Sequence, residues 1–283
     1  MWGIILGMVV VWSVAMLSRN TIRAYWWSHR LAVSETPNER LLYFRRLADL
    51  GDTAVPAVAK LLSKSDPGLR SFAVGVLHHA HSDRARELLQ QACQDADEDV
   101  ARLAMQGIAM RRNGIALQSL ADIARAGNER RAMMATAAIS ELGTADARKL
   151  LLDLLESTKQ TAVRVEAIEC LGNLQVHEAV ESLIDLLGDA SVFEGTTEHG
   201  VMASRAFQAV QLHNAEDLVG GEAPALLVEK YHVVWKCAHQ ALSAITGHTP
   251  ILDTTQEADQ QTIAAAWREW RRQTKSGGDS AIP

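Results

Sequence analysis

Apolar residues recur along the middle of the chain with a spacing that predicts repeated helical pairs. Alanines separated by 31, 31, 31 and 32 residues align five copies of one pattern: Ala54, Ala85, Ala116, Ala147 and Ala179. Behind each alanine, apolar residues follow at offsets of four, seven and eight, as at Leu151, Leu154 and Leu155. These offsets place the apolar side chains on one face of an α-helix. A helical period near 31 predicts an α-solenoid, in which each hairpin buries its apolar stripe against the next.

Polar turn signals set the boundaries of the expected elements. Gly, Asn and Asp, which end one helix and cap the next, divide the region into hairpins at roughly 39–64, 67–96, 98–125, 129–157 and 160–188. Ser34–Asn38 has the composition of a linker, and the period fails after Leu187. We therefore predict an all-α fold with a solenoid over 39–250, made of about five regular repeats and one or two degenerate ones.

The end of the chain is expected to close the array. Ile263, Trp267 and Trp270 are spaced to lie on one face of a helix, which we expect to cap the last repeat within 251–275. Residues 276–283 are predicted to be a disordered tail.

The repeating units resemble HEAT repeats. The best matches are the stretches ISELGTADARKLLLDLL and IECLGNLQVHEAVESLIDLL. Two sets of charged residues resemble the family's ladders: Arg70, Arg102, Arg131 and Arg164 near the starts of first helices, and Asp52, Asp83 and Asp146 near the turns. The resemblance covers about 39–245 and departs from the pattern at Arg111-Arg112-Asn113, where an apolar helix end is missing. It implies that the second helices line a concave face.

The first 33 residues have the character of a membrane anchor. Trp2–Leu17 is uncharged and apolar, and Arg19 can extend it toward the roughly 20 residues that a helix needs to cross the hydrocarbon. A signal peptide normally has a basic residue before its apolar run, which is missing here, and a buried soluble helix fits poorly with four of the seven tryptophans in the first 27 residues. The residues expected to form the anchor are Trp2, Ile4, Ile5, Leu6, Val9, Val10, Val11, Trp12, Leu17, Arg19, Trp26 and Trp27.

The charge distribution predicts orientation and excludes one class of partner. Arg19, Arg23 and Arg30 follow the apolar run, so the positive-inside rule predicts a single-pass protein with its repeats on the cytoplasmic side. The rest of the chain has 25 basic and 34 acidic residues, because these three arginines come from a total of 28 basic residues. An acidic solenoid does not attract phosphate in general, so no nucleic-acid partner is expected.

Candidate residues for chemistry do not form a catalytic set. His78, His79 and His81 are close in sequence, but adjacent histidines on a helix point about 100° apart. His177-Glu178 and Glu198-His199 invite comparison with deoxyhypusine hydroxylase, a HEAT-repeat enzyme whose His-Glu pairs recur, but here the pair does not recur in successive repeats. Glycine-rich phosphate loops and hydrolase or zincin motifs are also missing from the sequence, so no metal, cofactor or enzymatic activity is predicted.

The outward positions of the second helices suit a protein partner, because they are mixed in sign and carry no aromatic residue. The residues expected to contact a partner are Lys60, Gln90, Gln94, Gln118, Asp122, Lys149, Asp153 and Glu156, with Phe193 from the polar insertion after the fifth repeat. The leading hypothesis is a membrane-anchored HEAT-repeat scaffold for protein interaction. The alternative is an enzyme or enzyme subunit similar to HEAT-like phycobilin lyases, acting on a tetrapyrrole or protein, with Cys170 or Cys237 needed for turnover.

Overall fold

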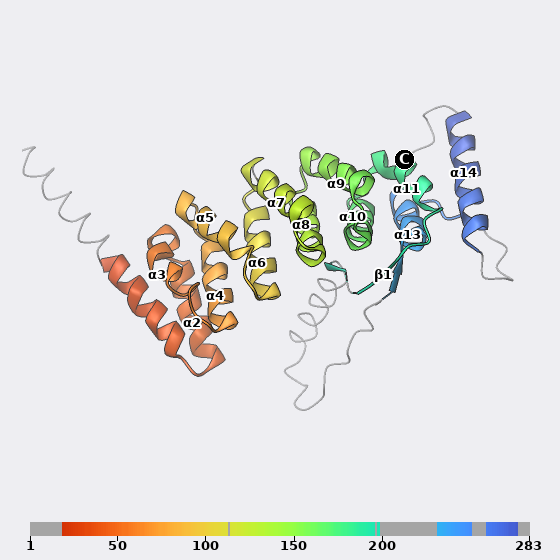
Figure 1. Cartoon of the computed structure of the whole chain (residues 1–283). Coiled ribbons are helices and arrows are strands. Elements are labelled where there is room, and N and C mark those ends of the chain that lie inside the picture. Colours follow the sequence, from red (N-terminus) through yellow and green to blue (C-terminus); the bar gives the residue numbers. More distant parts are fainter. Residues whose placement is uncertain (1–18, 113, 196, 199–230, 251–258, 277–283) are drawn as a thin grey trace, which may run out of the picture. The chain divides into compact units, whose positions relative to one another are not determined.

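The computed structural model of the chain describes residues 19–112, 114–195, 197–198, 231–250 and 259–276. The contacts divide the chain into two compact units, residues 1–119 and 120–283. Both units consist mainly of helical hairpins (Figure 1). The boundary between the units falls within α7 (Gly114–Ala126).

The first described element of unit 1 is a helix over residues 19–33. Its first helices, which pack side by side, are α2 (Pro37–Ala48), α4 (Pro67–His78) and α6 (Glu98–Ala109) (Figure 1). Its second helices are η1 (Gly51–Ala54) with α3 (Val55–Ala59), and α5 (Asp83–Ala92). Side-chain oxygens of Asp66, Ser82 and Asp97 accept hydrogen bonds from backbone N–H groups in the first turns of α4, α5 and α6, which explains where these helices begin.

Unit 2 repeats the arrangement. Its first helices are α8 (Glu129–Leu142), α10 (Thr161–Asn173) and α13 (Val234–Thr246), and its second helices are α9 (Ala145–Ser157) and η2 (His177–Ala179) with α11 (Val180–Leu186). Gly143 ends α8 at φ 64°, a left-handed conformation that glycine adopts without strain, and Thr144 caps α9. The helical hairpins expected from the apolar period are therefore present.

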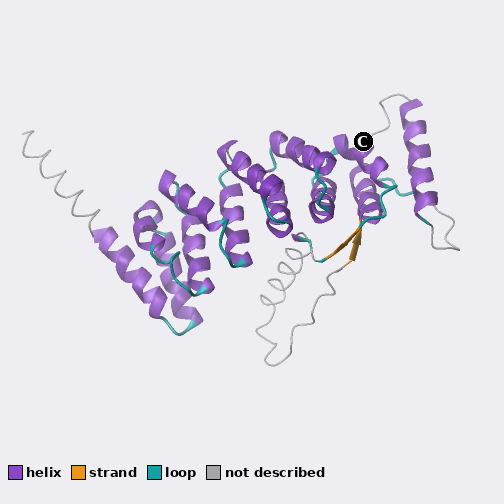
Figure 2. Ribbon diagram, viewed as in Figure 1, coloured by secondary structure: helices purple, strands orange, loops and turns teal. Residues whose placement is uncertain are grey.

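The prediction of an all-α fold needs one correction. β1 (Val192–Glu194) and β2 (Tyr231–Val233) pair as a two-stranded antiparallel sheet beside α10 and α13 (Figure 2). Phe193 lies opposite His232 in its register. Strands of three residues are too short to show an alternating pattern, and their partners lie far apart in sequence.

The apolar stripes form the core of each unit. The five aligned alanines are at most 2% exposed, and the stripe residues Leu151 and Leu154 are buried behind them. The first helices approach one another through small residues. A Cβ on Gly107 in α6 would lie 2.3 Å from the His78 ring of α4, and one on Gly172 in α10 would lie 3.0 Å from Ala241 of α13. Such close approach brings neighbouring first helices into tight contact.

Arginine clamps tie each first helix to the preceding hairpin. Arg70 Nη1 donates to the carbonyl oxygens of Lys64 at 2.9 Å and Ser65 at 2.8 Å, in the turn between α3 and α4. In the same way, Arg164 Nη2 donates to Thr158 O at 2.9 Å, directly after the end of α9. Arg70 also binds both carboxylate oxygens of Asp95 at 2.8 Å, and Arg164 Nη1 lies 2.6 Å from Asp189. Each clamp therefore joins the end of one hairpin to the end of the next.

The position in the helix decides which arginines form these clamps. Arg70 and Arg164 are the fourth residues of α4 and α10, and Arg40, the fourth residue of α2, donates from Nε to Ser34 O at 2.9 Å. In α6 and α8 the fourth positions are the buried Ala101 and Ala132. Arg102 and Arg131, also expected in the ladder, are shifted by one residue, which turns a side chain by about 100° around the helix.

Hydrogen bonds to the preceding and the following hairpin hold the turn between α4 and α5. Asp52 of the preceding hairpin accepts hydrogen bonds from the backbone N–H groups of His81 at 2.8 Å and Ser82 at 2.7 Å. The bond from Ser82 is the main cause that lowers the pKa of Asp52. Arg111 of the following hairpin donates to Ala80 O at 2.8 Å. Arg111 stands where the repeat pattern predicts an apolar helix end, and its hydrogen bond gives it a structural role.

α14 (Gln260–Ser276) packs against α11. Trp267 is 0% exposed, and its Nε1 donates to Nδ1 of His239 in α13 at 2.8 Å. Arg271 and Lys275 lie 2.7 and 2.6 Å from Glu181 of α11, and they lower its pKa. Residues 277–283, the predicted tail, lie outside the described residues.

The predicted anchor, Trp2–Leu17, also lies outside the described residues. None of the helices that the structure describes is long and apolar enough to cross a membrane. In the helix over residues 19–33, the side chain of Trp26 is 53% exposed. The guanidinium group of Arg46 lies over the ring of Trp27, 5.8 Å from the ring centroid. The two tryptophans thus face different surroundings.

We expect Arg70→Ala to lower the free energy of unfolding by about 2 kcal/mol, because it removes charged hydrogen bonds and leaves the largely buried Asp95 without this partner. Urea denaturation measures the change. Arg84→Ala is the matched control, because the ion pair of Arg84 with Glu87 is exposed, and it should cost less than about 0.5 kcal/mol. Equal costs for the two variants would contradict the clamp.

We expect α14 to become less firmly held as the pH falls. Burial lowers the pKa of His239, and its Nδ1 can accept from Trp267 only while the ring is neutral. The unfolded chain takes up this proton near pH 6.5, so the stabilisation is complete above that pH and declines below it toward the folded pKa. NMR titration should show His239 titrating below its ordinary value.

The stability of His239→Gln provides the control for this titration. The glutamine oxygen can accept the Trp267 hydrogen bond without titrating, so this variant should lose less stability between pH 7.5 and 5.5 than the wild type. A His239 pKa at or above about 6.5 would contradict the explanation.

Candidate functional site

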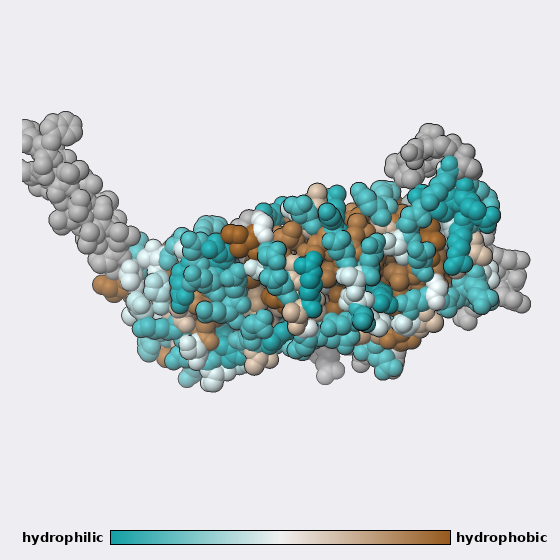
Figure 3. Space-filling view, turned by 45° about the horizontal axis from the view of Figure 1, so that its top comes forward, coloured by the Kyte–Doolittle hydropathy of each residue, from teal (hydrophilic) through white to brown (hydrophobic). Residues whose placement is uncertain are grey.

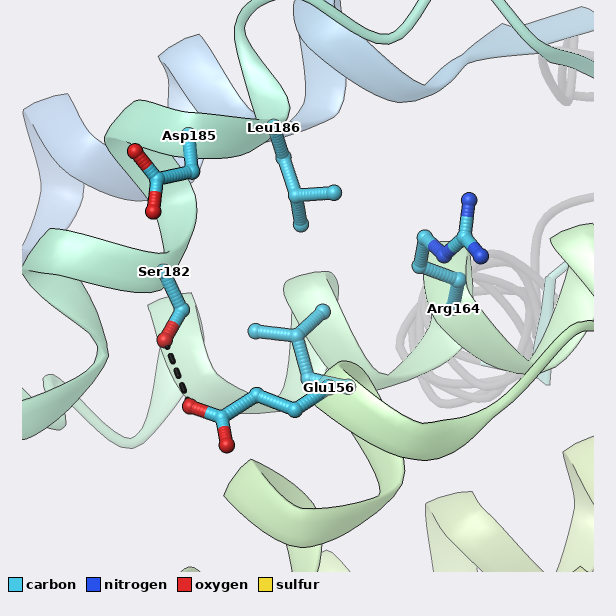
Figure 4. Close-up of a pocket in the computed structure, with 6 residues that line it drawn as sticks. Glu156, Arg164, Ser182, Asp185 and Leu186 are labelled. Atoms are coloured by element: carbon cyan, nitrogen blue, oxygen red, sulfur yellow. Dashed lines mark hydrogen bonds between the residues drawn. The ribbon is translucent and has the colours of Figure 1, made fainter.

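A groove opens between the second helices α9 and α11 in unit 2 (Figure 4). Its volume is about 380 Å³, and its walls are formed by Leu155, Glu156, Arg164, Ser182, Asp185 and Leu186. Ser182 of α11 donates to Oε1 of Glu156 of α9 at 2.8 Å, which links the two walls across one end (Figure 4). Leu155 and Leu186 supply an apolar surface between these polar groups.

The groove carries net negative charge. Arg164 is held by Asp189 and by the carbonyl of Thr158, so its charge is balanced within the clamp. Glu156 and Asp185 are both exposed on the walls. A ligand that enters this groove therefore meets two carboxylates beside leucine side chains, a combination that favours cationic groups attached to an apolar stem.

Unit 1 has a groove at the equivalent place, between α3 and α5. Its volume is about 320 Å³, and it is lined by Ala59, Leu62, Ser63, Arg84, Leu88, Gln91, Ala92 and Asp95. The clamp arginines Arg70 and Arg164 stand 94 residues apart, and the same offset relates Leu62 to Glu156, Leu88 to Ser182 and Gln91 to Asp185. The repeat thus produces the groove in both units, but both carboxylates of the α9–α11 groove replace uncharged residues.

In Figure 3, hydrophilic residues cover most of the face shown, and hydrophobic residues appear in strips between them. The hydrophobic strips mark where apolar side chains are partly uncovered.

The residues predicted to contact a partner fall into several environments. Those that are exposed are Lys60, Gln94 and Gln118 in unit 1, and Asp122, Lys149, Asp153 and Glu156 in unit 2. Lys60 lies over the ring of Tyr25 at 4.7 Å, and Gln90 is half-buried and donates to Ser119 Oγ at 2.7 Å. Of this set, Glu156 lines the α9–α11 groove.

Sequence reasoning missed the groove itself. In the sequence, Asp185 and Leu186 follow Glu156 by about one repeat. Their distance in space from Glu156 depends on how far apart the second helices α9 and α11 lie. The clamp arginines were the available signal, because each groove lies beside one. The remaining predicted residue, Phe193, is half-buried in β1, where its ring stacks on His232 with 6.0 Å between centroids.

Three residues with metal-binding side chains converge elsewhere in unit 2. Glu169 of α10, His232 of β2 and Cys237 of α13 have ligand atoms within 4.8 Å of one another. Oε1 of Glu169 lies 3.5 Å from Nδ1 of His232. These residues are separated by long stretches of sequence, so no local motif pointed to them. We expected no metal in this protein, and these three residues all have side chains of types that bind metal ions.

The other residues considered as candidates for chemistry lie in different environments. His78 lies half-buried, its Nε2 is 2.9 Å from Leu103 O, and burial lowers its pKa. Cys170 is fully buried, and burial raises its pKa well above the ordinary value, so it is a poor nucleophile. His177 and Glu178 are exposed in η2. Glu198 is buried beside Arg130 at 3.0 Å, and His199 lies outside the described residues.

Comparison with known proteins supports the resemblance seen in the sequence. A family model described as HEAT repeats matches residues 26–109 and 117–197, and the gap contains Arg111-Arg112-Asn113, where the pattern departs. No curated protein matches the chain.

Solved structures show partial likenesses. Human deoxyhypusine hydroxylase in complex with glycerol is 16% identical, with 82% of this chain and 98% of that chain covered and a TM-score of 0.36. An engineered protein is 16% identical, with 79% and 96% covered and a TM-score of 0.34. A designed armadillo repeat protein is 18% identical, with 78% and 99% covered and a TM-score of 0.30. These scores are too low to carry an argument about function.

Proposed function

We infer that this chain, which belongs to the HEAT-repeat family, is a scaffold that binds another protein through the α9–α11 groove of unit 2. The observation that carries the proposal is the combination in that groove of two exposed carboxylates, Glu156 and Asp185, with the apolar side chains of Leu155 and Leu186. Stacked helical pairs present extended surfaces of this kind to protein ligands.

The chemistry of the groove supports one kind of partner. We propose a protein segment that carries basic residues on an apolar surface, such as a basic amphipathic helix. Lysine or arginine side chains would lay their aliphatic stems on the leucines and direct their charges to the carboxylates. Because the rim charges are exposed, complementary charge would chiefly speed association and select against acidic partners.

We also propose that the segment 1–18 anchors the scaffold in a membrane, with the repeats on the cytoplasmic side. The composition of Trp2–Leu17 is the main support. In the helix that follows, Ile22 is 68% and Trp26 is 53% exposed, and Arg30 lies 5.9 Å from the centroid of the Trp26 ring. Exposed apolar and aromatic side chains beside arginines are typical of the membrane–water interface.

The enzyme alternative has weaker support. The buried, protonated state favoured for Cys170 opposes its use in covalent attachment. Cys237 is also largely buried, but it belongs to the cluster with Glu169 and His232.

Charge reversal in the groove tests the scaffold. A photo-reactive amino acid at position 182 should crosslink a partner in cells, and Glu156→Lys with Asp185→Lys should reduce the crosslinked yield about tenfold, through charge repulsion equivalent to about 1.4 kcal/mol. Glu129→Lys, an exposed acid of α8 outside the groove, is the matched control and should leave the yield unchanged.

Two outcomes would contradict the groove proposal. One is an unchanged crosslinked yield in the double variant that still folds by circular dichroism. The other is an acidic partner segment at the crosslinked site, which mass spectrometry of the crosslinked peptide would identify.

Charges placed within the apolar segment test the anchor. Wild-type protein should stay with membranes during carbonate extraction, whereas Val9→Asp with Val10→Asp should release it, because each aspartate in the centre of a span costs about 3 kcal/mol. Val33→Asp is the control, because Val33 is 53% exposed in the helix that follows the segment. Release of the wild-type protein from membranes by carbonate would contradict the anchor proposal.

A further inference from the structure

The cluster of Glu169, His232 and Cys237 draws its members from three separate elements. Glu169 lies on α10, His232 on β2 and Cys237 on α13, and their ligand atoms all lie within 4.8 Å of one another. His232 and Cys237 are each 7% exposed, and Glu169 is half-buried. The three side chains therefore face a common point beneath the surface of unit 2.

The packing of two first helices brings two of these side chains together. α10 and α13 approach most closely where Gly172 faces Ala241, and a Cβ on Gly172 would lie only 3.0 Å from the Ala241 Cβ. Glu169 is three residues before Gly172, and Cys237 is four residues before Ala241, so each lies one helical turn before the point of closest approach. The short distance between the helices is what allows a carboxylate and a thiol to meet.

The sheet positions the third side chain. His232 is paired with Phe193 in the register of β1 and β2, and the Phe193 ring stacks on the imidazole at an interplanar angle of 29°. β2 runs directly into α13, which begins at Val234, so the histidine is held against the same helix that carries Cys237. His232 Nδ1 then lies 3.5 Å from Glu169 Oε1.

We propose that Glu169, His232 and Cys237 bind one zinc ion. A thiolate, an imidazole nitrogen and a carboxylate oxygen are the three kinds of ligand that proteins offer to zinc, whereas magnesium and calcium select oxygen ligands alone. Bonds of about 2.0 to 2.1 Å at a tetrahedral angle separate nitrogen and oxygen ligands by about 3.3 Å, close to the 3.5 Å between His232 and Glu169. The sulfur completes the set after a small side-chain movement.

Two of the three proposed ligands line a cavity. Glu169 and Cys237 line a cavity of about 280 Å³ with Gly172, Asn173, Gln240, Ala241 and Ala244. It has room for water, which can fill the fourth position of a tetrahedral zinc site. The ion would also connect α10, β2 and α13, so it would strengthen the attachment of the sheet to the last described first helix of the array.

Cobalt serves as the probe, because Co²⁺ adopts the zinc geometry and its absorption reports on thiolate ligands. The full chain, freed of metal by a chelator, should bind about one equivalent of Co²⁺ with a sulfur-to-cobalt charge-transfer band and visible bands of tetrahedral intensity. Zn²⁺ should displace the cobalt and raise the melting temperature, and chelation should reverse the rise.

The variants separate a binding site from a packing cluster. Cys237→Ala should abolish the charge-transfer band, and Glu169→Gln and His232→Asn should each weaken cobalt binding more than about tenfold. Cys93→Ala, a buried cysteine of unit 1, should keep the band. Glu169→Gln preserves size and shape, so a loss of metal binding in this variant with an unchanged helical circular dichroism spectrum excludes misfolding as the cause.

The proposal is overturned if the wild-type chain takes up neither Co²⁺ nor Zn²⁺, in which case the cluster is a hydrogen-bonded contact between helices. It is also overturned if Cys237→Ala keeps the charge-transfer band. Both outcomes are independent of the partner experiment, because Glu156 and Asp185 lie in a different cavity from Glu169 and Cys237.

Discussion

First helices pack more closely against one another than second helices do, and the rest of the structure depends on this difference. A single hairpin cannot bury its own apolar stripe, so each must stack on another. First helices meet through glycine and alanine, as at Gly172 and Ala241, and therefore approach closely. Second helices carry leucines at their contacts and leave grooves, one between α3 and α5 and one between α9 and α11. The same arrangement that builds the core thus creates the grooves, one of which we propose as the surface for a partner.

The arginine clamps hold that arrangement at the ends of the hairpins. Arg70 and Arg164 each join a carbonyl in the segment after one second helix to an aspartate in the segment after the next one. Their hydrogen bonds satisfy backbone carbonyl groups that would otherwise depend on water. Since both grooves lie beside a clamp, the separation of their walls is held by charged hydrogen bonds as well as by apolar contact.

The sequence predicted the helices well because their signals are local. The aligned alanines and the leucines behind them repeat at fixed offsets, and a side chain's face on a helix follows from its number. The ladder of arginines was less well predicted: Arg102 and Arg131 are one residue out of register, while Arg40 has the right position and was overlooked. A shift of one residue is small in sequence but turns the side chain to another face.

The features that escaped prediction depend on contacts between distant residues. The strands are three residues long and pair across a long stretch of chain, so they have no periodicity to detect. The groove and the Glu169, His232 and Cys237 cluster exist only because particular helices lie at particular distances. Amino-acid type showed that these residues could bind something, but only the packing shows which of them meet.

α10 connects these features within unit 2. Arg164 at its start forms the wall of the groove, Glu169 one and a half turns later belongs to the cluster, and Gly172 sets the contact with α13. The helix is packed on nearly all sides, with Val163, Val165, Ala167 and Ile168 all buried. A helix held this firmly places its functional side chains in advance of any ligand, which reduces the entropy that binding must otherwise overcome. The backbone positions of Arg164 and Glu169 are therefore fixed by the packing of α10 before either proposed ligand binds.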